Sequence, residues 1–135
     1  MSTSAHPFLI RHSVMNKPMR RDVFVYLSGP ITAVNGWTIE RNIRAASMVY
    51  YDLLNRGIPA FCPHSSAFDP RAFADVPYDV WLEYDCAVID RCTHLLMLPR
   101  WEQSQGAMRE KAYAEAHGKR IILSHIELLT DLGMI

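Results

Sequence analysis

The stretch Val23-Phe-Val-Tyr-Leu-Ser-Gly-Pro30 carries the strongest fold signal in the sequence. Its first six residues form a nearly continuous apolar run, which is typical of a strand buried on both faces of a sheet. Gly29-Pro30 ends the run, because proline lacks the N–H that an interior strand must donate. Such a strand predicts a parallel sheet that is covered by helices on both sides.

Strand and helix signals alternate along the rest of the chain. A helix is expected over residues 37–55, because its apolar positions recur at intervals of four and three residues, and Gly57 suits its C-terminal cap. The prolines and polar residues of 62–77 predict a long loop, of a kind that often forms a functional lid. We further expect strands at 58–61, 94–98 and 121–123, helices at 78–92 and 105–117, and a short final helix that begins with a capping box at Ser124.

This alternation predicts right-handed βαβ units. The expected fold class is α/β: one flavodoxin/Rossmann-like three-layer domain with a parallel sheet of four to five strands. Ligands of such sheets bind beyond the carboxyl ends of the strands, where the strand order reverses. This rule selects residues 28–35, 62–77 and 99–106 as the candidate binding segments.

The 135 residues suffice for one domain, and a 50% hydrophobic, 21% charged composition is ordinary for a globular chain. Residues 1–20 hold three cations and no acid, so we expect a flexible basic N-terminal arm before a domain over 21–135. The formal net charge of zero argues against duplex nucleic acid as a partner, since that binding depends on neutralised phosphates.

The expected cellular compartment and the expectation of no cofactor both depend on features that the sequence lacks. No apolar run is long enough to cross a bilayer or to form the core of a signal peptide. The three cysteines form no CxxC pair, and each is expected to be a small buried apolar residue. We therefore expect a cytoplasmic protein with no membrane partner. No His, Cys and acid cluster has metal-ligand spacing, so neither a metal nor a cofactor is expected.

Small polar residues follow the predicted strands. Ser28 and Gly29 leave the first strand where backbone N–H groups can face a ligand. Ser104 and Gly106 lie at a helix start, whose free N–H groups and dipole favour an anion, although Ser104 also suits a plain N-cap.

Two acids are candidates for chemistry. Glu110 lies about one turn into that helix and can point back over the sheet edge, because helical side chains lean toward the N-terminus. The alternative is a surface acid paired with Arg109 or Lys111. Asp85 lies in the helix before the third strand, where a solvated aspartate is the alternative.

Together these segments resemble the nucleoside 2-deoxyribosyltransferase superfamily. The resemblance covers residues 22–124 and rests on Tyr26-Leu-Ser-Gly-Pro30, on Asp85 in a helix, and on Leu98-Pro-x-Trp-Glu-x-Ser-x-Gly-Ala-x-x-Glu110. Within that superfamily the chain is most similar to the small DUF4406 proteins, and more distantly to N-glycosidases that hydrolyse nucleoside 5′-monophosphates.

The resemblance implies a role for each matching residue. Glu110 matches the glutamate that attacks C1′ of the sugar, Tyr26 the tyrosine that positions it, and Asp85 the aspartate that handles the nucleobase and its proton. The residues that match the surroundings of the sugar and its 5′ end are Ser28, Gly29, Pro30, Trp101, Ser104 and Gly106.

Ser104 occupies a position where many of the transferases carry an aspartate, and relatives that favour 5′-phosphates carry serine. A neutral serine at a helix N-terminus suits a phosphate better than an aspartate does, which favours a nucleotide substrate. Arg41, Arg44 and Arg100 are the candidates to hold that phosphate. Arg109 is adjacent to the proposed nucleophile and is expected to reduce its charge.

The predicted function is cleavage or transfer at the N-glycosidic bond of a nucleoside or nucleoside 5′-monophosphate. A carboxylate can stabilise and trap the cationic sugar, and a second acid can protonate the leaving base. Alternatives are a non-catalytic nucleotide-binding module and an NAD-type glycohydrolase. Apolar residues expected to be exposed on the first helix (Met48, Val49, Tyr50 and Tyr51) predict a homodimer or homotetramer, and the alternative is that they cover the sheet within one chain.

Overall fold

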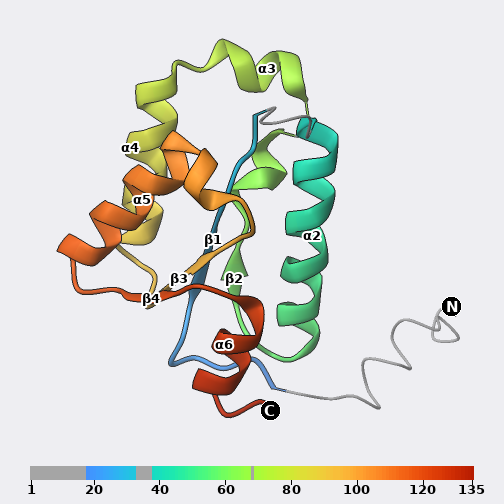
Figure 1. The fold of residues 1–135 in the computed structure, drawn as a ribbon, viewed down its shortest axis with the longest axis vertical. Coiled ribbons are helices and arrows are strands. Elements are labelled where there is room, and N and C mark those ends of the chain that lie inside the picture. Colours follow the sequence, from blue (N-terminus) through green and yellow to red (C-terminus); the bar gives the residue numbers. More distant parts are fainter. Residues whose placement is uncertain (1–17, 33–37, 68) are drawn as a thin grey trace, which may run out of the picture.

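Strand β1 (Val25–Ser28) lies inside a four-stranded parallel sheet of order β2-β1-β3-β4 (Figure 1). The computed structural model describes residues 18–32, 38–67 and 69–135. The other strands are β2 (Ala60–Phe61), β3 (His94–Met97) and β4 (Arg120–Ile122), and β1 pairs in parallel with both β2 and β3. The predicted α/β class is confirmed, and the strand order agrees with a flavodoxin-like domain.

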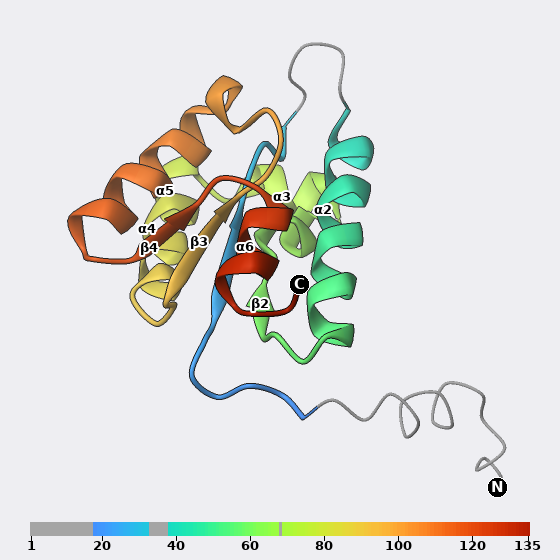
Figure 2. The same ribbon diagram turned by 60° about the horizontal axis from the view of Figure 1, so that its bottom comes forward.

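Helices cover both faces of the sheet in three layers (Figures 1 and 2). The α-helices are α2 (Ile39–Asn55), α3 (Pro70–Asp75), α4 (Tyr78–Ile89), α5 (Gln105–Ala116) and α6 (His125–Asp131), with 3₁₀ helices η1 (Pro63–Ala67) and η2 (Trp101–Gln103). Helices α2 and α6 lie on one face, and α4 and α5 on the other. In the described part of the chain, no helix is long and apolar enough to cross a membrane.

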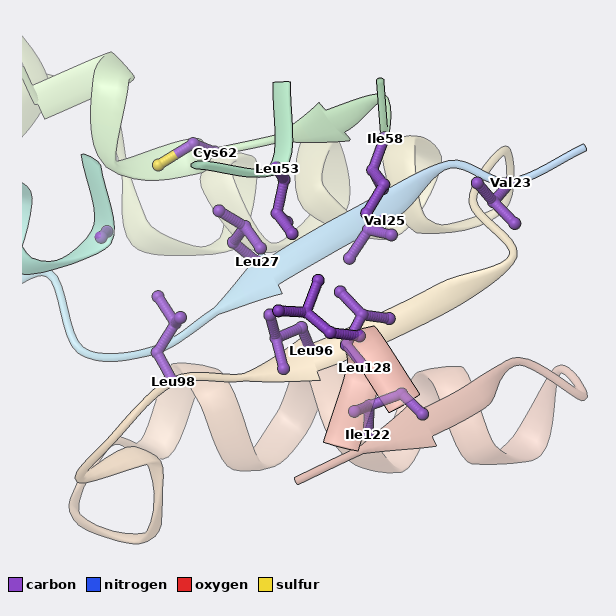
Figure 3. Close-up of a cluster of buried hydrophobic side chains, with 12 residues drawn as sticks. Val23, Val25, Leu27, Leu53, Ile58, Cys62, Leu96, Leu98, Ile122 and Leu128 are labelled. Carbon is purple, nitrogen blue, oxygen red and sulfur yellow. The ribbon is translucent and has the colours of Figure 1, made fainter. Parts of the chain in front are cut away.

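Alternate residues of β1 divide between the two layers, as the period of two in a strand requires. Val25 and Leu27 point to the α2/α6 side, where they pack with Leu53, Leu96 and Leu128 (Figure 3). Tyr26 belongs to the cluster on the α4/α5 side, and Ser28, two residues further, shares its face of the strand. One face of β1 is thus purely apolar core, and the other presents two hydroxyl groups.

The loop prediction for residues 62–77 is wrong, because η1 and α3 occupy most of this segment. The Asp69 carboxylate accepts hydrogen bonds from the backbone N–H groups of Arg71 and Ala72, and Pro70 takes the first helical position. Polar residues and proline at a helix start are start signals, not only loop signals. The segment nevertheless follows β2 at the binding edge, as expected.

The surface of α2 is less apolar than predicted. Val49 and Tyr50 pack against the α2/α6 core, whereas Met48 is 70% exposed and Tyr51 is also exposed. A partner subunit therefore has a smaller apolar patch to cover than the sequence indicated. The prediction that each cysteine is buried is confirmed for Cys62 and Cys92 and wrong for Cys86, which is partly exposed.

The proposed basic arm falls mostly outside the described residues, which begin at 18. Arg20, which we placed in the arm, is bound to the domain. Its backbone N–H donates to the Gly57 carbonyl at 2.8 Å, and its guanidinium donates to the Leu132 carbonyl at 3.0 Å.

Gly29 follows β1 at a point where the backbone passes directly over Leu98. A Cβ built at Gly29 would lie 2.7 Å from the Leu98 Cβ, closer than carbon atoms can approach. Gly106, in the first turn of α5, has no such neighbour, and its nearest contact would be the Tyr78 hydroxyl at 3.7 Å. Only the first of these two glycines is required by packing within the chain.

We predict that Gly29→Ala lowers the free energy of unfolding by about 1–3 kcal/mol, the usual cost of overpacking a well-filled core. Gly106→Ala is the matched control, and its unfolding free energy should stay within about 0.5 kcal/mol of wild type. Urea denaturation monitored by circular dichroism measures both. Equal stability of the two variants would contradict the packing assignment.

Candidate functional site

The site lies between β1 and β3, where the strand order reverses. From β1 the chain continues to β2 on one side, and it then crosses to β3 on the other side of β1. A cavity of about 680 Å³ opens there, beyond the carboxyl ends of the strands. Its lining comes from the residues after β1, from η1, from the α3–α4 segment and from the start of α5. All three segments that the sequence selected contribute to this lining.

Glu110 of α5 is buried at the bottom of the site with both carboxyl oxygens engaged. The Tyr26 hydroxyl donates to Oε2 at 2.9 Å, and the Ser28 hydroxyl donates to Oε1 at 2.7 Å. Both donors are side chains of β1 that project toward α5. The alternative of a surface acid is wrong, because Glu110 is only 7% exposed and Lys111 pairs with Glu115 instead.

Asp85 of α4 is the second carboxyl at this position. It is 9% exposed and lines the cavity together with Glu110. Its Oδ1 is buried and has no hydrogen-bond partner within the described chain. A buried polar atom without a partner is costly, so an oxygen in this state next to a cavity is suited to meet a ligand.

Glu110 and Asp85, which we call the carboxyl pair, influence each other's ionisation. Burial raises the pKa of Glu110 well above its usual value, and the neighbouring Asp85 raises it further. Burial also raises the pKa of Asp85. Two adjacent carboxyls in a buried site cannot both ionise easily, so the pair retains one proton to a higher pH than either residue alone.

The groups around the carboxyl pair keep this arrangement in place. Burial and the charge of Glu110 raise the pKa of Tyr26 well above its usual value, so its hydroxyl stays protonated and able to donate. Arg109 does not neutralise Glu110 as expected. Its guanidinium lies 5.5 Å from the centre of the exposed Tyr78 ring instead.

Three further predicted residues reach the cavity. Gly29, Ser104 and Gly106 all line it. The Ser104 hydroxyl caps α5 by accepting from the Ala107 N–H at 3.1 Å, which leaves its own hydrogen to donate elsewhere. Tyr26 and Ser28 act on the site through Glu110 and lie behind the lining.

Two predicted residues lie elsewhere. The Pro30 carbonyl accepts from the buried His64 Nε2 at 3.0 Å, and Pro30 is not among the lining residues. Trp101 packs against the α4/α5 core, with Lys111 Nζ 5.5 Å from its ring centre. Neither side chain belongs to the described lining.

The proposed phosphate-binding arginines also lie outside the cavity lining. Arg41 and Arg44 border a separate shallow depression on α2, and Arg100 donates to Asn42 at 3.1 Å. Among the described lining residues there is no lysine or arginine. The described lining would therefore offer a phosphate backbone N–H groups and hydroxyls.

Sequence reasoning missed the aromatic wall of the cavity and two buried polar side chains. Phe73 and Trp81 pack with ring centres 5.1 Å apart, and the Trp81 indole donates to the Phe73 carbonyl at 3.0 Å. Trp81 precedes Asp85 by four residues, so the spacing could have placed both on one helix face. Asn42 and His64 are buried, and the former stands out as a polar residue on the apolar face of α2.

A family profile described as "Domain of unknown function (DUF4406)" matches residues 23–123, about three quarters of the chain. The chain belongs to the DUF4406 family. The matched region of this DUF4406 protein contains both carboxyls and both hydroxyl donors described above. The search of curated proteins gave no match. In the described part of the DUF4406 chain, no three His, Cys, Asp or Glu side chains are arranged to hold a metal ion.

The carboxyl pair should make the stability of the protein depend on pH. A carboxyl whose pKa is raised by folding contributes stability that is full below its unfolded pKa of about 4.3 and is lost as pH rises through the folded pKa. We therefore predict that Glu110→Gln, which cannot ionise, raises the melting temperature at pH 8 more than at pH 5.

His64 gives stability the opposite dependence on pH. Burial lowers its pKa to about 4, so the folded protein becomes less stable as pH falls below about 6.5. This contribution is common to wild type and variant, so it cancels in their difference. Thermal unfolding of both proteins from pH 5 to 9 measures the effect. A difference that does not change with pH would contradict the raised pKa.

Proposed function

We propose that the protein cleaves or transfers at the N-glycosidic bond of a nucleoside or nucleoside 5′-monophosphate, with Glu110 as the nucleophile. The observation that carries the proposal is the pairing of a fully hydrogen-bonded buried Glu110 with an Asp85 oxygen that lacks a partner. Two carboxyls in different surroundings can take different roles at one pH. Their position at the strand-order reversal is where such sheets bind ligands.

The first step needs one ionised and one protonated carboxyl. In the free protein the raised pKa of Glu110 keeps the proton of the pair on that residue. The reaction begins when this proton passes to Asp85, and the two hydroxyl donors then hold Glu110 as a carboxylate. A Glu110 oxygen attacks C1′ while the C1′–N bond breaks and its electrons go to the base. Asp85 gives its proton to the departing base nitrogen. The products are a glycosyl ester on Glu110, a free base and an ionised Asp85.

The second step restores the enzyme. A water molecule, or the nitrogen of another base, attacks C1′ and displaces the Glu110 carboxylate. Asp85 takes the proton that the attacking group loses. The cycle conserves the single proton of the pair, which explains why a buried pair with raised pKa values suits this reaction.

The remaining cavity walls suit the two ends of such a substrate. The Phe73 and Trp81 rings and the carboxyl of Asp85 supply an aromatic and a polar contact for a nucleobase. The first turn of α5, with Ser104 and Gly106, supplies the N–H groups that a sugar hydroxyl or a 5′-phosphate requires.

We also keep the prediction that copies of the chain associate. Met48 and Tyr51 remain exposed on α2 and form the patch that a homodimer or homotetramer could cover.

We predict that wild type releases free base from at least one member of a panel of nucleosides and nucleoside 5′-monophosphates, and that Glu110→Ala abolishes the release. Chromatography of the products measures it, and Glu115→Ala, an exposed acid on the same helix, is the matched control. Stabilisation by a panel member without any base release would instead support the nucleotide-binding alternative, and release of nicotinamide from NAD would support the glycohydrolase alternative.

We predict that Asp85→Asn lowers kcat by about 10²–10⁴-fold, the usual contribution of a general acid. Asp79→Asn, an exposed aspartate on the same helix, should retain wild-type kcat. The profile of kcat against pH should lose its alkaline limb in Asp85→Asn. An unchanged profile would contradict the role of Asp85 as proton donor.

A further inference from the structure

Asn42 is a polar residue buried in the apolar face of α2, where it is 2% exposed. Its side-chain amide donates to the carbonyls of Ile31 and Thr32, at 3.1 and 2.9 Å. Its Oδ1 accepts from Arg100 Nη2 at 3.1 Å. A single side chain thus bonds to the segment after β1 and to the segment after β3.

Arg100 adopts an unusual backbone conformation in making this contact. Its φ of 68° lies in the left-handed region, and among the described residues it is the only non-glycine with positive φ. Such strain persists only where the surrounding structure holds it, and it is common near functional sites. Here it directs a guanidinium from the turn after β3 toward α2.

The two segments joined by Asn42 each lead into a wall of the cavity. Ile31 and Thr32 line it after β1, and residues 103–107, from the end of η2 into α5, line it after β3. The carboxyl pair and its hydroxyl donors lie on β1, α4 and α5, and the first turn of α5 also belongs to the second wall. The hydrogen bonds of Asn42 nevertheless differ from those that hold Glu110, which come from Tyr26 and Ser28.

The direction of these bonds also determines what the first wall presents. The carbonyls of Pro30, Ile31 and Thr32 are all turned toward buried side chains, His64 for the first and Asn42 for the other two. In a planar trans peptide the N–H points opposite to the carbonyl before it. The N–H groups of Ile31 and Thr32 therefore point away from those side chains, where a row of donors suits the oxygen atoms of a ligand.

We propose that Asn42 and Arg100 are positioning residues that set the separation of the two cavity walls and the direction of the donors after β1. They act on substrate binding and not on the chemical step. This proposal rests on the proposed function for the identity of the substrate, but the link between the walls is testable without one.

The kinetic test uses whichever panel member wild type cleaves best. Asn42→Ala should raise KM by roughly tenfold or more and leave kcat within about threefold, because binding contacts are lost while the reacting groups are not. Arg100→Ala breaks the same link from the other end and should have the same effect, and Arg100→Lys should recover part of it. Asn55→Ala, an exposed asparagine on α2, is the matched control.

A variant whose kcat falls at unchanged KM, or whose two constants both stay at wild-type values, would overturn the positioning role. A purely structural role would reduce the amount of active protein without moving KM. Failure of wild type to cleave any panel member would overturn the proposed function, and the link between the walls is then judged by the second measurement.

That measurement is amide hydrogen exchange of the protein without ligand. In Asn42→Ala the peptides covering residues 29–32 and those covering residues 100–106 should both exchange faster than in wild type and in Asn55→Ala, whereas β1 and β3 should not change. Faster exchange in only one of the two segments, or in neither, would overturn the link between the walls.

Discussion

The buried carboxyl of Glu110 is the constraint on which the rest of the site depends. An ionisable group in an apolar layer is tolerated only when its oxygens are hydrogen-bonded. Two residues of the central strand, Tyr26 and Ser28, supply those bonds. They alternate with Val25 and Leu27, which fill the opposite core, so one short strand serves both the packing of the domain and the orientation of the carboxyl. Asp85 of α4 is the second carboxyl of the pair, and its buried Oδ1 has no hydrogen-bond partner in the described chain.

The order of the strands explains why these groups meet. Because β1 and β3 are neighbours while the chain turns outward in opposite directions from them, the segments that follow both strands open around one crevice. Buried polar side chains fix these segments: Asn42 bonds to both, and His64 bonds to the Pro30 carbonyl. The carboxyl of Glu110 is thus held by bonds from β1, and the segments around it are held by the bonds of Asn42 and His64.

Much of this could be predicted from the sequence, because the signals were local and periodic. The apolar run of β1, the interval of four and three in α2 and the capping serine at residue 104 each specify an element within a few residues. The mistakes share a cause. Asp69 and Pro70 were interpreted as loop residues although both start α3. Trp101 was assigned to the site because it belongs to the motif that carries the family resemblance, although its ring packs into the core. The bonds of Asn42 join residues up to 58 positions apart, and no local pattern specifies a contact of that kind.

The most direct test of this account is the titration of the carboxyl pair itself. Carbon-13 NMR of the side-chain carboxyls, with Glu110→Gln and Asp85→Asn for assignment, follows each group as pH changes. The account predicts that the Glu110 signal titrates well above the ordinary range for glutamate and that its midpoint falls when Asp85 is replaced by asparagine. Titration of both carboxyls near pH 4, each indifferent to the loss of the other, would contradict it.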